Sequence, residues 1–89
     1  MEFEFDAAKS AANKAKHGIN FFEAQALWLD DDFVEIPTRS EREHRFIVIG
    51  RIAGLHWTAV VTIRERRVRL ISARRARRKE VAFYESRGL

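Results

Sequence analysis

Residues 44–72 read HRFIVIGRIAGLHWTAVVTIRERRVRLIS, and this stretch decides the fold. It is rich in β-branched and aromatic residues, which favour strands. The pattern predicts three consecutive strands, at about 44–52, 55–64 and 67–72. Because the connections between them are short, we expect these strands to pair as antiparallel hairpins at the centre of a small sheet.

The two turns determine which side chains share a face of the sheet. If Ala53-Gly54 turns the first hairpin, Trp57 lies opposite Gly50 within a row of apolar residues. If Glu65-Arg66 turns the second hairpin, its apolar residues extend the same row. A shift of one residue would turn every side chain to the other face, so the agreement between the two hairpins supports this register.

The opposite face of the predicted sheet is basic. Beside an aliphatic centre it carries Arg45, Thr62 and Arg69 in one cross-strand row, and Arg64 opposite Arg67 beyond that row. Guanidinium groups placed in this way are suited to binding phosphate oxygens. The weak point is Glu65-Arg66, a poor two-residue turn sequence, because a bulge there would move Arg67 and Arg69 to the other face.

Positive charge is concentrated at the end of this stretch. Residues 64–79 hold nine of the seventeen Lys and Arg residues and one acidic residue, a net charge of +8, and the rest of the chain carries eight basic and twelve acidic residues, or −4. Crowded arginines repel one another and oppose the dipole of a helix that begins beside them. We therefore favour an anion-binding surface over a merely solvated one.

Length and composition limit the class of protein. Eighty-nine residues predict one domain over 1–89, and the absence of cysteine excludes disulfides and thiolate metal sites, as suits a reducing cytoplasm. The N-terminus lacks the features of a secretory signal. The longest apolar run, residues 46–50, is far too short to span a bilayer, so we expect no membrane association.

The N-terminal segment predicts a short strand followed by a helix. Phe3 and Phe5 alternate with glutamates, as in an edge strand. Asp6 is suited to cap a helix that runs to about His17, where Gly18 provides a left-handed stop.

A second helix is predicted from the capping box of Asn20 and Glu23 to about Leu29. Its buried side is expected to carry Phe22, Ala26 and Leu29. Trp28 falls off that side and is a candidate partner-binding aromatic residue.

The remaining elements are a short strand at about 33–36 and a final helix from about Ala73 to Ser86, capped by Ser72. We therefore expect an α+β fold in which a small antiparallel sheet is combined with two N-terminal helices and one C-terminal helix.

A set of motifs follows a fixed order along the chain. They are Phe3-Glu4-Phe5-Asp6, Lys9, Asn13, Lys16-His17-Gly18, Phe22-Glu23-Ala24, Asp30, Arg69-Leu70-Ile71-Ser72-Ala73-Arg74, Ala76, Glu80 and Tyr84. In this order, over about residues 3–85, the set resembles the BrnT toxin family. Phe5 stands where that family usually has a tryptophan.

The resemblance implies a RelE-like fold and a toxin of a type II toxin–antitoxin system. It implies that RNA is cleaved without a metal ion or other cofactor and that translation is inhibited in the bacterial cytoplasm. It also implies neutralisation by a BrnA-type ribbon-helix-helix antitoxin. That antitoxin represses the operon in complex with the toxin, so operator DNA is contacted only through it.

Cleavage of RNA by its own 2′-hydroxyl requires a base, an acid and cations around the phosphate. Histidine suits the proton transfers because its ordinary pKa is about 6.5. We therefore treat His17, at the end of the first predicted helix, and its neighbour Lys16 as candidate catalytic residues. A histidine at that position also complements the helix dipole, and Lys16 is equally explained as a solvated charge.

Arginines supply the strongest candidates for holding the phosphate. Arg69 and Arg74 are assigned to the catalytic centre, with Arg74 expected at the start of the final helix, where backbone N–H groups also bind anions. The residues assigned to RNA binding are Arg45, Arg64, Arg67, Arg75, Arg77 and Arg78. The last three are equally suited to meeting an acidic antitoxin.

Glu80 and Tyr84 lie one helical turn apart. Glu80 is a candidate base or a carboxylate that orients an arginine, and the simpler alternative is an ion pair with Arg77. Tyr84 is a candidate for stacking or proton transfer, and otherwise packs in the core. The three histidines are not spaced as metal ligands, so no metal is expected.

Three functions are consistent with these observations. The leading one is a metal-independent endoribonuclease toxin. The second is a non-catalytic module that binds nucleic acid or an antitoxin through the same basic surface. The third is a structural subunit whose basic edge docks an acidic partner. Lys16-His17 favours catalysis, because a binding module needs charge but no titrating group.

Overall fold

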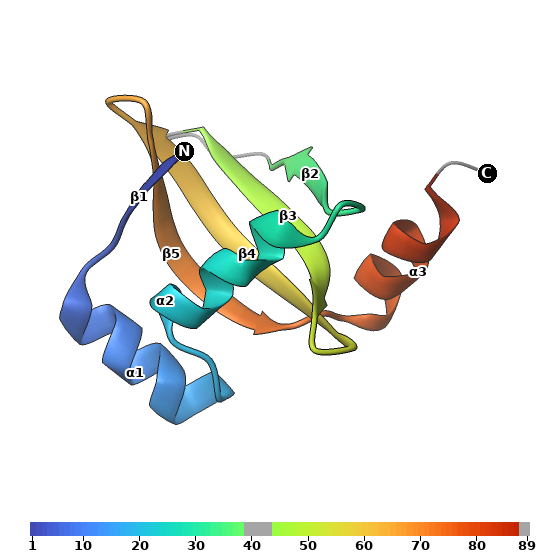
Figure 1. The fold of residues 1–89 in the computed structure, drawn as a ribbon, viewed down its shortest axis with the longest axis horizontal. Helices are drawn as coiled ribbons and strands as arrows, with labels where there is room; N and C mark the ends of the chain where they lie inside the picture. The colour runs from blue at the N-terminus through green and yellow to red at the C-terminus, as the bar shows by residue number, and fades with distance from the viewer. Residues whose placement is uncertain (39–43, 88–89) are drawn as a thin grey trace.

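The computed structural model describes residues 1–38 and 44–87, in which a five-stranded sheet carries the helices (Figure 1). Along the chain the elements are β1 (Glu2–Glu4), α1 (Ala7–His17), α2 (Phe21–Ala24), the 3₁₀ helix η1 (Gln25–Leu29), β2 (Val34–Pro37), β3 (Arg45–Ile52), β4 (Leu55–Arg64), β5 (Arg67–Arg75) and α3 (Arg78–Ser86). The strand order is β1-β5-β4-β3-β2. The α+β class is confirmed, but the sheet is mixed and not wholly antiparallel, because β1 pairs parallel to β5.

The predicted register of both hairpins is confirmed. Gly50 pairs with Trp57 across the first hairpin, and Arg64 pairs with Arg67 across the second. The turn residues Glu65 and Arg66 both have positive φ, 49° and 67°, as a two-residue hairpin turn of type I′ requires. The poor turn sequence is therefore accommodated without a bulge at that point.

A bulge occurs farther along β5. Val61 pairs with Leu70, but Val60, the residue before it in β4, pairs with Ser72, so Ile71 lies in a bulge between the two pairs. The extra residue shifts the alternation of side chains, and as a result Leu70 and Ala73 both face the core, at 3% and 0% exposure.

The predicted start of the final helix is wrong. Ala73 is not its first residue and Ser72 is not its cap, because β5 continues to Arg75 and α3 begins at Arg78. The physical reason is that β4 extends to Leu55 and offers backbone partners to the end of β5. These hydrogen bonds and the burial of Ala73 outweigh the helix propensity of the segment.

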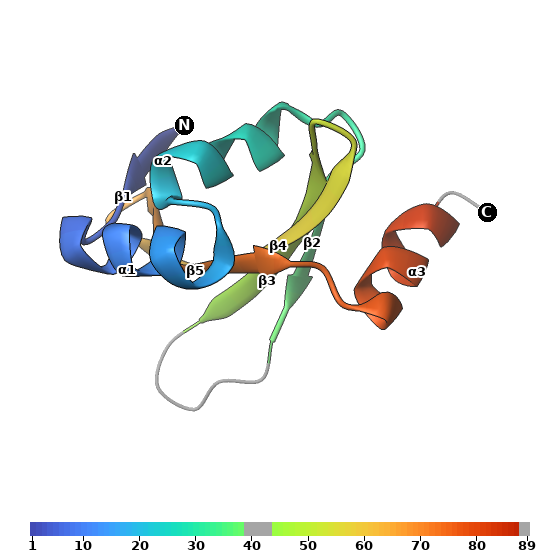
Figure 2. The same ribbon diagram turned by 90° about the horizontal axis from the view of Figure 1, so that it is seen from below.

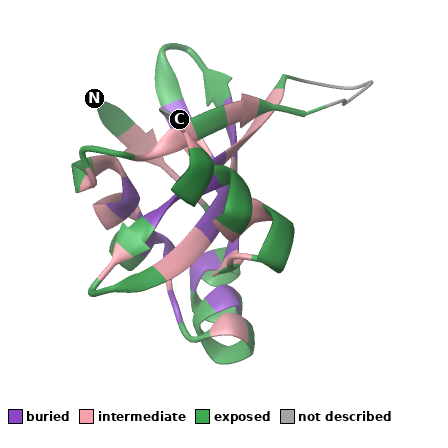
Figure 3. Ribbon diagram, turned by 90° about the vertical axis from the view of Figure 1, so that its right-hand side faces the viewer, coloured by how far each residue is buried: buried purple, intermediate pink, exposed green. Residues whose placement is uncertain are grey.

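Different helices cover the two faces of the sheet. α2 and η1 lie across what we call the first face (Figure 2). The core between them consists of Ile19, Phe21, Ala24, Leu27, Val48, Ala59, Val61, Val68, Leu70 and Ala73. On the opposite, second face, α3 lies in front of one end of the strands (Figure 3), where Thr58 is completely buried and bonds to Glu80 of α3.

The buried side of the second helical segment differs from the prediction. The capping box of Asn20 and Glu23 is confirmed, but α2 ends after one turn and the chain tightens into η1. A 3₁₀ helix repeats every three residues, so the residues that face the sheet are Phe21, Ala24 and Leu27. Phe22 and Leu29, predicted to be buried, are 73% and 82% exposed.

Helix α1 matches its prediction and attaches to the edge of β5 through one side chain. Asp6 caps its start by accepting the Lys9 N–H, and Gly18 ends it at φ 82°. The Asn13 amide donates to the carbonyls of Ile19 and Ala73, both at 2.8 Å, and accepts the Ala73 N–H at 3.2 Å. The amide therefore satisfies backbone groups of β5 that have no strand beside them, since β1 pairs only with residues 67–69.

We expect Asn13→Ala to lower the free energy of unfolding by about 2–3 kcal/mol, because it leaves three buried backbone groups without their partner. Urea denaturation followed by circular dichroism measures the change. The exposed Lys9→Ala on the same helix serves as the control and should change stability by no more than about 0.5 kcal/mol. Equal stability of the two variants would show that Asn13 does not hold α1 to β5.

Candidate nucleic-acid interface

The end of the second face that is remote from α3 is an arginine cluster. Arg45 and Arg69 flank Thr62 in one cross-strand row, and Arg64 pairs with Arg67 in the next. We call these four arginines the arginine face. Cross-strand neighbours lie about 5 Å apart at Cβ, so the cluster has a high local positive charge that suits phosphate oxygens.

Strand β1 supplies carboxylates to this cluster. Its parallel pairing places Glu2 beside Arg67 and Glu4 beside Arg69. Arg67 Nε lies 3.0 Å from Glu2 Oε2, and Arg69 Nη1 lies 3.8 Å from Glu4 Oε2. The protein itself therefore supplies part of the negative charge that the arginines require. The Glu2 pair is well exposed and contributes little to stability, so an incoming phosphate can replace the carboxylate.

Arg74 is held by a carboxylate at the other end of the second face. It lies in β5, not at the start of α3 as expected, and its two terminal nitrogens donate to Glu80 at 2.7 and 2.9 Å. Glu80 Oε1 also accepts from the Thr58 hydroxyl and the Arg77 N–H. Glu80 therefore forms its ion pair with Arg74 and not with Arg77 as the simpler alternative expected, and Arg77 contributes only its backbone N–H. In this arrangement Glu80 orients Arg74.

The protonation of Glu80 follows from this environment. Burial raises the pKa of its carboxyl, but hydrogen bonds from Arg74, the Arg77 N–H and Thr58 outweigh burial and bring the pKa to about 2. A carboxylate with so low a pKa is a weak base at neutral pH. The geometry therefore favours orientation of Arg74 over proton abstraction as the role of Glu80.

Tyr84 anchors α3 and lies apart from the arginine face. Its side chain is buried, its hydroxyl donates to Asp30 Oδ2 at 2.7 Å, and its ring meets His56 edge-on at 5.2 Å. Burial and the hydrogen bond to Asp30 raise the pKa of the hydroxyl to about 12. Asp30 Oδ2 also accepts the Arg51 N–H at 2.8 Å, so this carboxylate joins the end of η1 to both β3 and α3.

Lys16 and His17 lie at the middle of β5. The end of α1 places both beside Ile71 and Ser72, where they line a shallow pocket of about 260 Å³ together with Lys9. Along the strand, Arg69 precedes this point and Arg74 follows it. Four predicted catalytic residues are therefore distributed along one strand and its edge, whereas Tyr84 lies apart from them.

Three predicted RNA-binding residues lie outside the arginine face. Arg75 donates from Nε to the His56 carbonyl, and its guanidinium lies 5.4 Å from the ring centre of Trp57, on the first-face side. Arg77 and Arg78 are exposed where α3 begins. They extend the positive charge beyond the sheet without joining the cluster.

Sequence reasoning missed three contributors to this arrangement. Ser72 was assigned to a helix cap but lies in the pocket with His17, Thr58 supports Glu80, and Asp30 fixes Tyr84. The predicted register already placed Thr58 on the second face. Thr58 is linked to Arg74 through Glu80, and this link exists only because β5 continues to Arg75, which the sequence pattern did not indicate.

Within residues 1–38 and 44–87, no group of three or more His, Asp or Glu side chains is arranged to hold a metal ion. In the same ranges no helix combines the length and apolar character needed to cross a bilayer.

We expect Glu80→Gln to lower the free energy of unfolding at pH 7 by about 2 kcal/mol, because it removes the charge that pairs with Arg74. The pKa of Glu80 is about 2 in the folded state, below its ordinary 4.5, so its contribution is complete above pH 4.5 and declines as pH falls toward 2. Urea denaturation between pH 2.5 and 7 should therefore show the two proteins converging at low pH.

The control for this measurement is Glu85→Gln on the same helix, where a half-exposed carboxylate lies 3.3 Å from His56. It should change stability by no more than about 0.5 kcal/mol. A difference between the native protein and Glu80→Gln that does not depend on pH would contradict the ionic role of Glu80.

Comparison with known proteins bears on the function of this surface. The family model of the BrnT ribonuclease toxins of type II toxin–antitoxin systems matches residues 5–80, most of the chain. No curated relative matches it. The family suggested by the order of the sequence motifs is confirmed: the chain belongs to the BrnT family of ribonuclease toxins of type II toxin–antitoxin systems.

Proposed function

We propose that this protein is an endoribonuclease that cleaves RNA without a metal ion on the second face of the sheet. The observation that carries the proposal is the position of Lys16 and His17 against β5, between Arg69 and Arg74 of the same strand. This position supports the proposal, because it brings a candidate proton-transfer group to the strand that carries both arginines. The arginine face lies on the second face and provides binding sites for adjacent phosphates.

The chemistry assigned to each residue follows from its type. His17 exchanges a proton with the 2′-hydroxyl or the departing 5′-oxygen, since imidazole can do either near neutral pH. Lys16 and Arg69 stabilise the negative charge that develops on the phosphorus oxygens. Arg74, held by Glu80, positions the neighbouring phosphate. DNA lacks the 2′-hydroxyl and is not cleaved by this route.

The biological setting follows from the family. Cleavage of RNA in the bacterial cytoplasm would inhibit translation, and a BrnA-type ribbon-helix-helix antitoxin would neutralise the toxin. Operator DNA would then be contacted by the antitoxin and not by this chain. In this setting the arginine face binds RNA. The carboxylates of Glu2 and Glu4 lower its net charge, but they leave the half-buried Arg69 partly accessible to a phosphate.

A second function is favoured by one observation. Arg74 is already paired with Glu80 and Arg69 lies near Glu4, so these arginines are ordered without substrate, as in a surface that only binds nucleic acid. Such a module would bind RNA and leave it intact. The role of His17 separates the two functions, because binding needs no titrating group.

We expect the purified protein to cut RNA in excess EDTA and to leave cyclic or 3′-phosphate ends. His17→Ala should lower the cleavage rate at least about 100-fold, because it removes the proton-transfer group, while RNA affinity changes no more than about twofold. Gel analysis of products and a filter-binding assay measure the two quantities. His44→Gln, which changes an exposed histidine outside the pocket beside β5, is the control.

Three results would contradict this proposal. A requirement for magnesium would exclude the metal-independent route. Full activity of His17→Ala would show that the centre is misplaced. Tight RNA binding by the native protein without any cleavage would establish the non-catalytic function instead.

We expect the double variant Glu2→Gln/Glu4→Gln to bind RNA several-fold more tightly than the native protein, because it removes the carboxylates that compete with phosphate for Arg67 and Arg69. Fluorescence anisotropy at several salt concentrations should also show a steeper decline of affinity with salt. The control Asp31→Asn/Glu35→Gln has the same change of net charge away from the arginine face and should have a smaller effect. Equal effects of the two double variants would mean that only net charge matters.

A further inference from the structure

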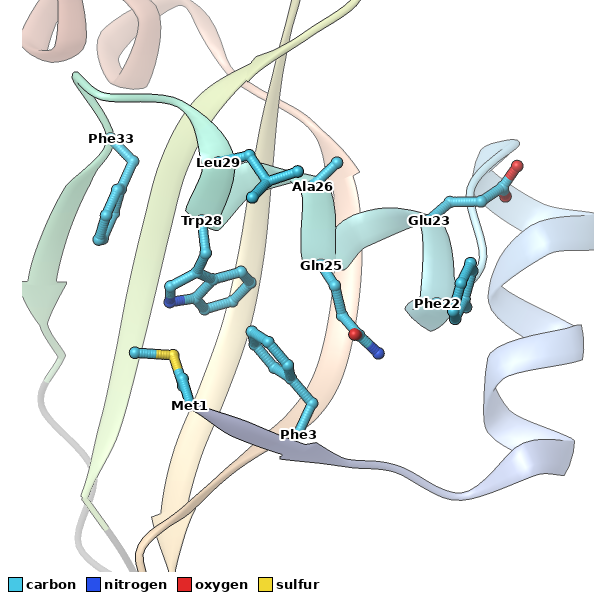
Figure 4. A pocket seen from close by; sticks show the side chains of 9 residues that line it. All are labelled: Met1, Phe3, Phe22, Glu23, Gln25, Ala26, Trp28, Leu29 and Phe33. Carbon is cyan, nitrogen blue, oxygen red and sulfur yellow. The ribbon is translucent and has the colours of Figure 1, made fainter.

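An apolar groove lies between β1 and the segment formed by α2 and η1, on the side of the sheet opposite the arginine face (Figure 4). Its volume is about 600 Å³. Phe3, Trp28 and Phe33 form its inner wall, and Met1, Phe22 and Leu29 stand at its rim. We call this feature the apolar groove.

The inner wall is ordered by contacts between aromatic rings. Trp28 meets Phe3 edge-on with ring centres 4.9 Å apart, and Phe33 lies 6.4 Å away on its other side. Rings held in this way lose little conformational entropy when a partner covers them. The groove is therefore a preformed surface.

The rim is unusually apolar for a surface exposed to water. Met1, Phe22 and Leu29 are 84%, 73% and 82% exposed. The tightening of the chain from α2 into η1 turns Phe21 and Leu27 toward the core and leaves Phe22 and Leu29 outside. Large apolar side chains grouped around a hollow mark interaction surfaces in soluble proteins.

The shape of the groove disfavours a small-molecule ligand. Such ligands are enclosed by an apolar pocket in which a few polar groups fix their orientation. Here the exposed side chains of Phe22 and Leu29 project beyond the hollow and would remain in water after a small ligand had bound. Only a larger apolar surface covers them.

The charges around the groove select among larger partners. Glu23 lies at one end of the groove, where it also pairs with Lys14, and Asp32, which follows Leu29 at the other end, pairs with Arg87. Asp31 and Glu35 are exposed carboxylates that also follow Leu29 in the chain and add negative charge there. Nucleic acid would be repelled there, and a symmetric pair of copies would bring the same carboxylates face to face.

We infer that the apolar groove docks an amphipathic segment of the antitoxin, one that carries large apolar side chains on one face and Lys or Arg at its ends. This inference rests on the antitoxin partner of the proposed function. The apolar side chains bury Phe22 and Leu29, and the basic ends meet the acidic residues around the groove. Because the arginine face lies on the other side of the sheet, antitoxin docking and RNA binding depend on separate residues.

The test uses the full-length toxin and its cognate antitoxin, with affinity measured by isothermal titration calorimetry. Phe22→Ser/Leu29→Ser should weaken antitoxin binding at least about 30-fold and leave RNA cleavage within about twofold of the native rate. Phe83→Ser is the matched control, since Phe83 is a half-exposed aromatic residue on α3, outside the groove, and it should bind antitoxin normally. Circular dichroism confirms that each variant is folded.

A charge reversal tests the chemistry of the partner. Asp31→Lys/Glu35→Lys should weaken antitoxin binding about tenfold at low salt and less at high salt, because it replaces attraction by repulsion. Sedimentation of the native toxin alone should show a monomer, and a dimer that Phe22→Ser/Leu29→Ser dissociates would assign the groove to a second copy and overturn the inference.

Other outcomes are equally decisive. Unchanged antitoxin affinity of Phe22→Ser/Leu29→Ser, or an equal loss in Phe83→Ser, would overturn the inference while leaving ribonuclease activity as measured. If no form of the protein cuts RNA, the proposed function fails, and loss of antitoxin binding in the groove variant still supports the docking surface.

Discussion

The bulge at Ile71 determines the side of the sheet on which Arg74 lies. Before it, Arg69 points to the second face while Leu70 points to the core. In a regular strand Arg74, five residues after Arg69, would point to the core, where an unpaired guanidinium is very unfavourable. The extra residue reverses the alternation, so Ala73 enters the core and Arg74 joins Arg69 on the second face.

The position of α3 follows from this reversal. On the second face Arg74 pairs with Glu80 of α3. Thr58, buried beneath α3, donates a further hydrogen bond to the Glu80 carboxylate. Near the other end of α3, Tyr84 reaches Asp30 at the end of η1. A nine-residue helix is marginal by itself, and these two attachments near its opposite ends explain how it remains in place.

The features that could be predicted from the sequence depend on near neighbours. The helix caps were recognisable because each involves only residues within one helical turn. They are the capping box of Asn20 and Glu23, Asp6 at the start of α1 and Gly18 at its end. The hairpin register followed from apolar alternation, which Trp57 opposite Gly50 reinforced. The bulge at Ile71 was not predictable, since Leu70 to Ala73 fits the start of a helix as well as a strand. Pairing with β4 is what makes this segment a strand.

The same limit explains the misassigned apolar residues of α2 and η1. A 3.6-residue period places Phe22 and Leu29 inside, whereas packing against Gly50 selects the tighter helix: a Cβ at Gly50 would lie 3.1 Å from Leu27. Close approach of Leu27 to the sheet therefore turns Phe22 and Leu29 outward. The two faces of the sheet therefore differ: the four residues of the arginine face lie on the second face, and the aromatic rings of the apolar groove lie on the first. A polyanion and a basic amphipathic partner would each be attracted to one face and repelled by the other, and this selection needs no change of shape.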